Sequence, residues 1–404
     1  MIPIDEQLYP LPEGWQWVTL DSVAECLDNL RSPVNSAERA KRPGKIPYYG
    51  ATGQVGWIDD FLTDEQLVLL GEDGAPFLDM FKDKAYIIEG KAWVNNHAHI
   101  LRSHFGNVGN RFLCHYLNAF NFSGYVNGTT RLKLTQAKMK KIPVPLPPPD
   151  EQQRIVSLLD ELFGALDEAK TLAQAVVDSA EFRRAAILHK AFIGELTKLW
   201  RDEHGITLDS WQRCQLSELL LPMQTKRPTG TTFRYIDIDS IDNERQSVRE
   251  PKIIETVKAP SRASRAVYSD NVLFSMVRPY LKNVAFIDEN LSDCIASTGF
   301  FVCRCKADLL PKFLYHFLCF DGTISYLTQF MKGDNSPSIR KNEFLGTPIN
   351  LPPLEEQKEI VRVLDDMLYR EQRTKDLALK IVERVELLKK SILARAFRGE
   401  LNID

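Results

Sequence analysis

Polar and cationic side chains gather on several loops that are rich in glycine, serine, threonine and proline. In the first half of the chain these loops are segments 32–45, 48–57 and 127–133, and in the second half they are 224–234, 259–265, 276–283 and 333–342. Arginine, lysine, asparagine, glutamine, serine and threonine are the side chains that contact phosphates and base edges of nucleic acids. Any one of these loops could equally be an ordinary solvated loop, but their presence in both halves favours a binding role.

The predicted nucleic-acid contacts are polar residues of these loops, together with two polar residues of the strand-like stretch 94–102. In the first half they are Lys41, Arg42, Lys45, Gln54, Asn96, His97, Asn127, Thr129, Thr130, Arg131 and Lys133. In the second half they are Lys226, Arg227, Arg262, Ser264, Arg265, Arg278, Tyr280, Lys282, Asn335, Ser336, Ser338 and Arg340.

Other chemistries find little support in the sequence. There is no GxxxxGK[ST] phosphate loop and no HExxH zinc motif. The glycine-rich stretch 50–56 follows Tyr48-Tyr49 rather than a clear strand, and no helix is predicted after it, so it does not fit a dinucleotide fingerprint. His97, His99 and His104 could hold a metal, although alternating strand histidines more often pack or contact phosphate. Segment 79–84 is predicted to be an exposed turn.

The elements that would position these loops are visible as an internal repeat. Gln152 aligns with Gln357, a period of 205 residues, and about 22 of 55 positions are identical between 142–196 and 347–401. The repeat extends toward the N-terminus, where Trp15 aligns with Trp211. Three shorter stretches, 68–75, 94–102 and 111–117, align respectively with 272–279, 296–304 and 312–318. Each repeat therefore predicts a globular part followed by one long helix.

The long helices are predicted from the residues that begin them and from a periodic stripe of apolar residues. Proline-rich entries precede acidic residues, which favour the positive end of a helix dipole. The stripe then alternates steps of four and three, as in a coiled coil, through Ile155, Leu159, Leu162, Leu166, Ala169, Ala173, Val176, Ala180 and Ile187. The second copy continues it with Ile360, Leu364, Met367, Ala378, Ile381, Val385, Leu388 and Ile392. Gly164 and Arg183 interrupt the first stripe, and Glu371 and Thr374 the second.

Composition sets broad limits. With 404 residues the chain has room for two or three domains, and its net charge of −3 neither indicates nor excludes nucleic-acid binding. Seven cysteines without a regular spacing suit a reducing compartment. No apolar run is long enough to span a membrane and no signal peptide is evident, so a cytoplasmic location is expected.

With those residues in view, the chain resembles the DNA-specificity subunit of type I restriction–modification systems. The most specific segments are PLPPPDEQQRIVSLLDEL and NLPPLEEQKEIVRVLDDM, each followed by an Ala-Phe-x-Gly-Glu-Leu element, and LPEGW, PYYGATGQVGW and APSRASR also match. The resemblance covers essentially the whole chain. Both repeats are complete, so we expect no truncation.

The resemblance implies an α+β architecture with two α/β target recognition domains, separated by two long antiparallel coiled-coil helices related by a pseudo-twofold repeat. The expected boundaries are 1–141 and 201–346 for the recognition domains, with helical regions 142–200 and 347–404. It implies double-stranded DNA, two modification (methyltransferase) subunits and the restriction subunits as partners. It implies no cofactor in this chain, with S-adenosylmethionine in the methyltransferase and ATP and magnesium in the restriction subunit.

Three functions are compatible with the sequence. The leading hypothesis is a non-catalytic DNA-recognition subunit, and the alternatives are an enzyme with an unrecognised site and a coiled-coil scaffold that does not bind DNA. We expect partner helices to dock on outer stripes that include Phe163, Val177, Phe192 and Phe397.

Overall fold

The structure is a computed structural model that describes residues 8–401. Its contacts divide the chain into two compact units. Unit 1 comprises the chain up to Gln174 together with Ala378 onward, and unit 2 comprises Ala175–Leu377. Each unit therefore contains one globular part and one half of each long helix. Within residues 8–401 no helix combines the length and the apolarity that crossing a membrane requires.

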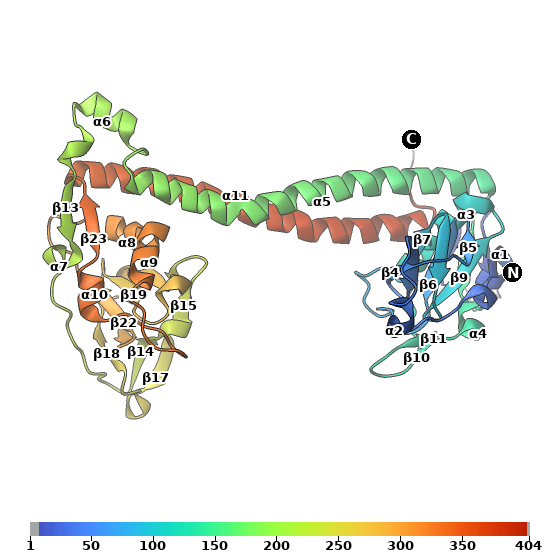
Figure 1. Ribbon diagram of the computed structural model, residues 1–404, viewed down its shortest axis with the longest axis horizontal. Coiled ribbons are helices and arrows are strands. Elements are labelled where there is room, and N and C mark those ends of the chain that lie inside the picture. The colour runs from blue at the N-terminus through green and yellow to red at the C-terminus, as the bar shows by residue number, and fades with distance from the viewer. Residues whose placement is uncertain (1–7, 402–404) are drawn as a thin grey trace. The chain divides into compact units, whose positions relative to one another are not determined.

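Unit 1 is built around a four-stranded sheet in the order β2-β9-β6-β7, and helix α3 packs on β6, β7 and β9 (Figure 1). A second four-stranded sheet has the order β4-β3-β8-β5. The elements are β1 (Gln16–Thr19), α1 (Leu20–Val23), β2 (Ala24–Cys26), η2 (Asp28–Leu30), α2 (Ser36–Arg39), β3 (Ile46–Gly50), β4 (Gly53–Ile58), β5 (Thr63–Asp64), β6 (Leu67–Gly71), β7 (Ala85–Ile88), β8 (Lys91–Val94), β9 (Ala98–Ser103), α3 (Gly106–Ala119), β10 (Val126–Asn127), β11 (Lys133–Leu134), α4 (Gln136–Met139) and β12 (Pro143–Leu146).

Unit 2 repeats this plan with a three-stranded sheet, β20-β19-β22, against which α8 packs, and a four-stranded sheet, β17-β14-β21-β18. Its elements are α6 (Lys198–His204), η3 (Leu208–Ser210), β13 (Gln212–Gln215), α7 (Leu216–Leu219), β14 (Thr232–Ile236), η4 (Ile238–Ser240), β15 (Ile241–Asp242), β16 (Ser247–Val248), β17 (Lys252–Glu255), η5 (Thr256–Lys258), β18 (Ala263–Ala266), β19 (Val272–Ser275), η6 (Pro279–Leu281), β20 (Val284–Phe286), η7 (Glu289–Leu291), β21 (Ile295–Ser297), β22 (Phe300–Cys303), α8 (Pro311–Cys319), α9 (Asp321–Thr328), α10 (Lys341–Leu345) and β23 (Pro348–Leu351).

The predicted correspondence between the two globular parts is confirmed. β6 pairs antiparallel with β9 in unit 1, and β19 pairs antiparallel with β22 in unit 2. All residues of β6 and β19 are buried, as expected for central strands covered on both faces. The strand that follows the aligned tryptophan also recurs, because β1 pairs with β12 and β13 pairs with β23.

Two long helices supply the scaffold. α5 (Pro149–Phe192) has 44 residues and α11 (Leu354–Ala396) has 43, which confirms the one long helix predicted for each repeat. They run antiparallel within each unit. In unit 1, Lys170 bonds Glu386 at 2.6 Å and Lys389 bonds Asp167.

In unit 2 the helix pair is joined by two further ion pairs. Arg183 bonds Glu371 at 2.6 Å and Lys375 bonds Glu181 at 3.5 Å. Two of the residues that interrupt the predicted stripes, Arg183 and Glu371, are therefore partners of each other.

The predicted stripe is only partly buried. Ile155, Leu159, Ile360 and Leu364 are buried, but Ala169 is exposed. In the unit 1 half of α11, Ala378 and Val385 are buried while Ile381 and Leu388 are each 46% exposed. The two helices thus contact along a narrower line than a full heptad seam.

Candidate nucleic-acid interface

The entry to each long helix is fixed by the same tryptophan–glutamate contact. The Trp15 indole Nε1 donates to Glu151 at 2.9 Å, and the Trp211 indole Nε1 donates to Glu356 at 2.8 Å. A glutamine one residue later closes the proline turn in both copies. Gln152 Nε2 donates to the Pro147 carbonyl, and its counterpart Gln357 donates to the carbonyl of Pro352. The repeated sequence therefore encodes repeated side-chain contacts.

A histidine–aspartate contact ties the short helix of each globular part to its long helix. His115 on α3 bonds Asp160 at 3.2 Å, and His316 on α8 bonds Asp365 at 2.8 Å. Burial lowers the pKa of both histidines. Burial alone would raise the pKa of Asp365, but its hydrogen bonds with His316 and Lys312 lower it to about 2.

The C-terminal end of each long helix is buried in a globular core, which corrects part of the docking prediction. Phe192 is 8% exposed and lies 5.4 Å from the Phe313 ring. Phe397 is 2% exposed and lies 5.3 Å from the Phe112 ring. The two phenylalanines were assigned to an outer stripe, and this placement is wrong because aromatic residues of α8 and α3 cover them.

The other two predicted docking residues, Phe163 and Val177, are partly exposed. The Phe163 ring packs edge-on against His115 and carries Lys389 over its face. Partner contact at Phe163 and Val177 remains a prediction.

The polar loops of unit 1 meet at the turn that follows β6. The Glu72 amide donates to the His97 carbonyl at 2.8 Å, the Leu134 amide donates to the Glu72 carbonyl at 2.8 Å, and the Gly74 amide donates to the Leu132 carbonyl at 3.0 Å. We call the segments joined in this way, 72–74, 95–97 and 127–134, the unit 1 loop cluster.

The polar loops of unit 2 meet at the turn that follows β19 through the same three main-chain bonds. The Met276 amide donates to the Gly299 carbonyl at 2.9 Å, the Ile339 amide to the Met276 carbonyl at 3.0 Å, and the Arg278 amide to the Pro337 carbonyl at 2.8 Å. The segments 276–282, 298–299 and 332–340 form the unit 2 loop cluster. The backbone arrangement is shared while the side chains on it differ.

Acidic residues orient the predicted contacts of the unit 1 loop cluster. Arg131 Nε bonds Asp73 at 2.7 Å, His97 Nδ1 lies 3.5 Å from the same carboxylate, and Lys133 bonds Glu72 at 3.2 Å. Arg131 and Lys133 stay largely exposed, so they can contact a ligand while held in place. Asn96, Thr129 and Thr130 are exposed in the same segments, and Asn127 accepts a hydrogen bond from Lys138.

A buried ion-pair network lies beneath this cluster. Oxygen and nitrogen ligand atoms of Asp28, Glu72 and His99 come within 4.8 Å of one another, a spacing that could hold a metal. However, the Arg31 guanidinium bonds both Asp28, at 3.1 Å, and Glu72, so a cation already neutralises these acids. Burial would raise the pKa of Asp28, but His99 and Arg31 hold it below its ordinary value. His97 and His99 bond different carboxylates, and His104 is exposed.

Three predicted contacts of unit 1 lie away from the loop cluster. Lys41, Arg42 and Lys45 are next to the Ile46–Ile58 end of the β3–β4 hairpin, whereas the Gly50–Gly53 turn at its other end lies near the cluster. The two ends are separated by roughly 13 Å of strand at about 3.3 Å per residue. Arg42 bonds Asp59 at 2.7 Å and lies over the Trp93 ring. Gln54 is exposed next to the turn.

β3 also corrects one statement made from the sequence. Tyr48 and Tyr49 do belong to a strand, which ends at Gly50. The segment after the glycines is strand β4 and not a helix, so the dinucleotide fingerprint remains excluded.

Arg278 occupies an unusual backbone conformation in the unit 2 loop cluster. Its φ is 48°, and Lys282 has a φ of 51°. Non-glycine residues in this left-handed region cost of order 1–3 kcal/mol and concentrate at functional sites. The equivalent residue of unit 1, by the shared hydrogen bond, is Gly74, with a φ of 79°. Unit 2 thus places an arginine where unit 1 uses glycine, and Arg278 also donates to the Asn335 carbonyl at 2.8 Å.

Ser264 and Arg265 lie on β18, and Lys226 and Arg262 lie next to that strand. The Lys226 amide donates to the Ser264 carbonyl at 3.0 Å, and the Thr298 amide donates to the Arg262 carbonyl at 2.9 Å. Because Thr298 belongs to the unit 2 loop cluster, Arg262 adjoins it. Arg265 Nε is buried and has no hydrogen-bond partner within residues 8–401. Arg227, Tyr280, Ser336 and Arg340 are exposed, Ser338 bridges to Lys332, and Lys282 bonds Asp321 at 2.5 Å.

Sequence reasoning missed Glu72 and Asp73, the acids that organise the first cluster. Cations and amides bind nucleic acid directly, whereas acidic side chains act here by orienting those groups. The signal was present, since an acidic pair directly follows the buried stretch LVLLG at the end of β6.

Together these features define a duplicated binding protein with two recognition units on a shared helical scaffold. The family model for the type I restriction modification DNA specificity domain matches residues 12–175 and 230–380. The chain belongs to this family, as its motifs predicted.

Two relatives are similar to this chain in sequence over most of its length. A putative type I restriction enzyme specificity subunit of Haemophilus influenzae is 28% identical over 378 residues, covering 87% of this chain and 86% of the relative. The EcoDI specificity subunit of Escherichia coli is 26% identical over 97% of this chain and 89% of its own length.

Two solved structures have a similar fold. The crystal structure of the HsdS subunit from Thermoanaerobacter tengcongensis matches with a TM-score of 0.62 and 19% identity, over 98% of this chain and all of that one. A chain from a structural study of type I restriction–modification complex assembly and conformational transition matches with a TM-score of 0.68 and 20% identity, over 97% of this chain and all of that one. The predicted fold class is confirmed.

Proposed function

We propose that this chain is the DNA-recognition subunit of a type I restriction–modification complex, with one loop cluster reading each half of a bipartite target. The observation that carries this proposal is the pair of matched clusters, in which the same three main-chain hydrogen bonds present different side chains. Equivalent backbones with unlike side chains suit two sites of one kind that read different sequences.

The target is therefore asymmetric. Each half comprises a few base pairs, and the halves are separated by a nonspecific gap of roughly half a helical turn or more, given about 10.5 base pairs per turn. Arg131 and Arg278 are suited to base or phosphate contact because each is exposed and anchored by a neighbouring group. A single uninterrupted palindrome as the recognised sequence would contradict this part of the proposal.

The chain is a specificity subunit and not itself an enzyme. It works with DNA and with methyltransferase and restriction partner subunits. We propose two modification subunits and the restriction subunits as the finer composition, in the cytoplasm. S-adenosylmethionine would be bound by the modification subunits, and ATP and magnesium by the restriction subunits.

The test is to express the chain with its modification subunits in a methylation-free host and map every methylated adenine. Arg131→Ala should relax one half of the motif, and Arg278→Gly should relax only the other half. An arginine that reads guanine contributes about 1–3 kcal/mol to discrimination. Arg102→Ala is the matched control, because Arg102 is a partly exposed arginine of unit 1 that pairs with Glu25 and Glu65 away from the cluster.

An unchanged motif in both cluster variants would refute the assignment of the clusters. A scaffold that does not bind DNA is the alternative function. It predicts that the purified complex has the same affinity for duplexes with and without the mapped motif.

A further inference from the structure

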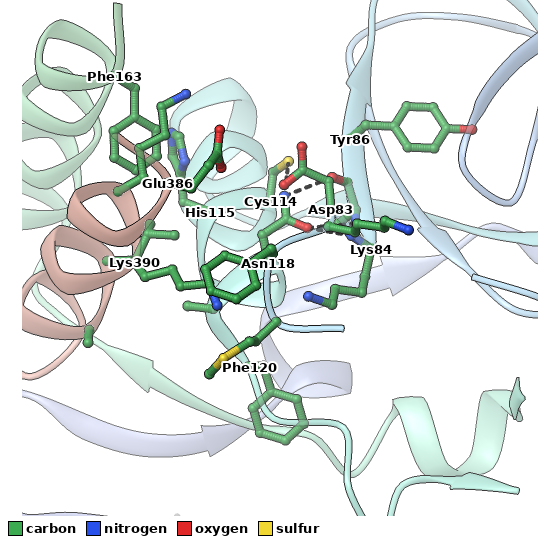
Figure 2. A pocket seen from close by; sticks show the side chains of 18 of the residues that line it. Asp83, Lys84, Tyr86, Cys114, His115, Asn118, Phe120, Phe163, Glu386 and Lys390 are labelled. Atoms are coloured by element: carbon green, nitrogen blue, oxygen red, sulfur yellow. Dashed lines mark hydrogen bonds between the residues drawn. The ribbon is translucent and has the colours of Figure 1, made fainter. Parts of the chain in front are cut away.

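Unit 1 contains a large pocket that the proposed DNA-reading role does not use. It is bounded by the segment Phe77–Tyr86, by α3 and by the unit 1 halves of α5 and α11, and its volume is about 980 Å³. Figure 2 shows Lys390 entering from α11 and Lys84 coming from the segment before β7. The volume lies at the upper end of the range for small-molecule sites, which is about 300–1,000 Å³.

Lys84 is the first unusual feature of this pocket. The sequence placed it in an exposed turn, but its side chain is only 2% exposed. The prediction of an exposed turn holds for residues 80–83 but is wrong for Lys84, because this residue directly precedes β7, whose first residue, Ala85, is buried. Within residues 8–401 no carboxylate lies within ion-pair distance of Lys84, although Asp79 and Asp83 are near enough to act on its charge. Burial lowers the pKa of this amine, and Lys390 lowers it further.

Lys390 is the second. Its Nζ is buried without a hydrogen-bond partner in the described part of the chain, and it lies 3.3 Å from the centre of the Phe81 ring. Two other lysines of the pocket are paired, since Lys170 bonds Glu386 and Lys389 bonds Asp167. An ammonium group that is buried without an anion is unfavourable, and contact with the Phe81 ring face offsets only part of that cost, so an anionic ligand would stabilise Lys390.

The rest of the lining combines aromatic rings with polar side chains such as His115, Asn118 and Asn121. Phe77, Phe81, Phe120 and Phe163 contribute to the walls, and five lysines against three acids leave an excess of positive charge. A pocket of this volume is too small to admit duplex DNA, which is a wide, highly charged rod. It fits a ligand whose body packs on phenylalanine rings and whose charged end meets the two unpaired amines.

We propose that this pocket binds a small amphipathic anion, an aromatic body that carries one carboxylate or phosphate group held between Lys84 and Lys390. The ligand would contact both the recognition part of unit 1 and its helix pair, and so would brace one against the other. This proposal does not depend on the proposed DNA-reading function.

The experiment uses the full-length chain, alone and with its modification subunits, and the fluorescent probe 8-anilinonaphthalene-1-sulfonate. Lys84→Met and Lys390→Met keep most of the side-chain volume and remove the charge. Lys82→Met is the matched control, because Lys82 lines the same pocket but is exposed and pairs with Asp79. The neutral analogue N-phenyl-1-naphthylamine reports apolar binding without an anion.

We expect the anionic probe to bind the wild-type chain and the Lys82 variant with equal affinity. It should bind each of the other two variants at least about tenfold more weakly, as loss of one charge-assisted hydrogen bond predicts. The neutral analogue should bind all four proteins equally. Displacement by 1-naphthoate or by 1-naphthyl phosphate then identifies the preferred charged group.

Equal affinity of the anionic probe for all four proteins would overturn the proposal, as would failure of both competitors to displace it. Equal loss of both probes in a variant with altered circular dichroism would indicate misfolding. In that case the Lys84→Gln and Lys390→Gln variants must show the selective loss of the anionic probe, or the proposal fails. None of these outcomes depends on DNA binding.

Discussion

In unit 2, we expect substitution of Glu356 to destabilise the start of the long helix more than substitution of any other residue there. Its side chain is fully buried, and it accepts hydrogen bonds from Arg201 at 2.5 Å, Thr197 at 2.7 Å and Trp211 at 2.8 Å. Glu356→Gln keeps the shape but removes the charge, which leaves the buried Arg201 guanidinium without a counter-ion. Breaking a buried ion pair on one side costs about 3–5 kcal/mol.

The repeat supplies a matched control at the equivalent position of unit 1. Glu151 also accepts from a tryptophan indole, at 2.9 Å, but it is partly exposed and has no ion-pair partner within residues 8–401. Glu151→Gln keeps an acceptor for Trp15 and strands no charge. The expected cost is therefore that of weakening one hydrogen bond, about 0.5–1.5 kcal/mol.

Thermal unfolding followed by calorimetry separates the two variants. A unit of roughly 200 residues loses about 2–4 °C in Tm per kcal/mol. Glu356→Gln should then lower the Tm of the affected transition by about 6–20 °C, and Glu151→Gln by no more than about 6 °C. We expect the buried ion pair to contribute more to the stability of the helix entry than the shared tryptophan contact does. This would be refuted if both variants lowered the Tm equally, or if Glu356→Gln lowered it less than Glu151→Gln.

Three further predictions follow from other parts of the chain. The first concerns Lys84, whose pKa in the folded chain is below its ordinary value of 10.5, so that between these two pKa values the unfolded chain binds more protons than the folded chain. The free energy of unfolding of the wild type should therefore rise with pH across this window, and Lys84→Met should reduce that rise. Urea titrations at several pH values measure the difference. Arg278→Gly should lower DNA affinity but leave the free energy of unfolding within about 1 kcal/mol of wild type, because relief of the left-handed backbone strain offsets the lost hydrogen bond to Asn335. A loss of stability above about 3 kcal/mol would contradict this prediction. Seven residues inserted after both Thr171 and Asp376 should preserve the apolar seam and lengthen the gap of the methylated motif by about one to three base pairs, whereas an active variant with the original gap would show that the helices do not set it.

The repeat explains why so much of the scaffold could be predicted. Its identities include the residues that make the duplicated contacts, such as Glu151 and Glu356, or Asp160 and Asp365. These residues are identical in the two copies and make the same side-chain contacts in both units. Helix lengths followed for the same reason, because proline-rich entries and glycine exits limit both helices.

The candidate site was predicted less well, because its geometry depends on residues far apart in the sequence. Arg131 is positioned by Asp73 and Lys133 by Glu72, and no local pattern connects these pairs. Periodicity also shows which face of a helix is apolar, but not what covers it. Phe192 and Phe397 were therefore assigned to an outer stripe although each is covered by aromatic residues of a globular core.

Positions at which the two copies differ within the shared scaffold are where the two units acquire distinct properties. Arg183 and Glu371 form an ion pair in unit 2, but the aligned positions in the other copies are Leu388 and Leu166. Lys390 of the unit 1 pocket likewise aligns with Ala185. A polar pair that is present in only one of the two repeats favours a single register of the helices. We therefore infer that the ion pair in unit 2 and the lysine pocket in unit 1 make the two ends of the helix pair chemically unlike, so that a nearly symmetric scaffold supports an asymmetric reader.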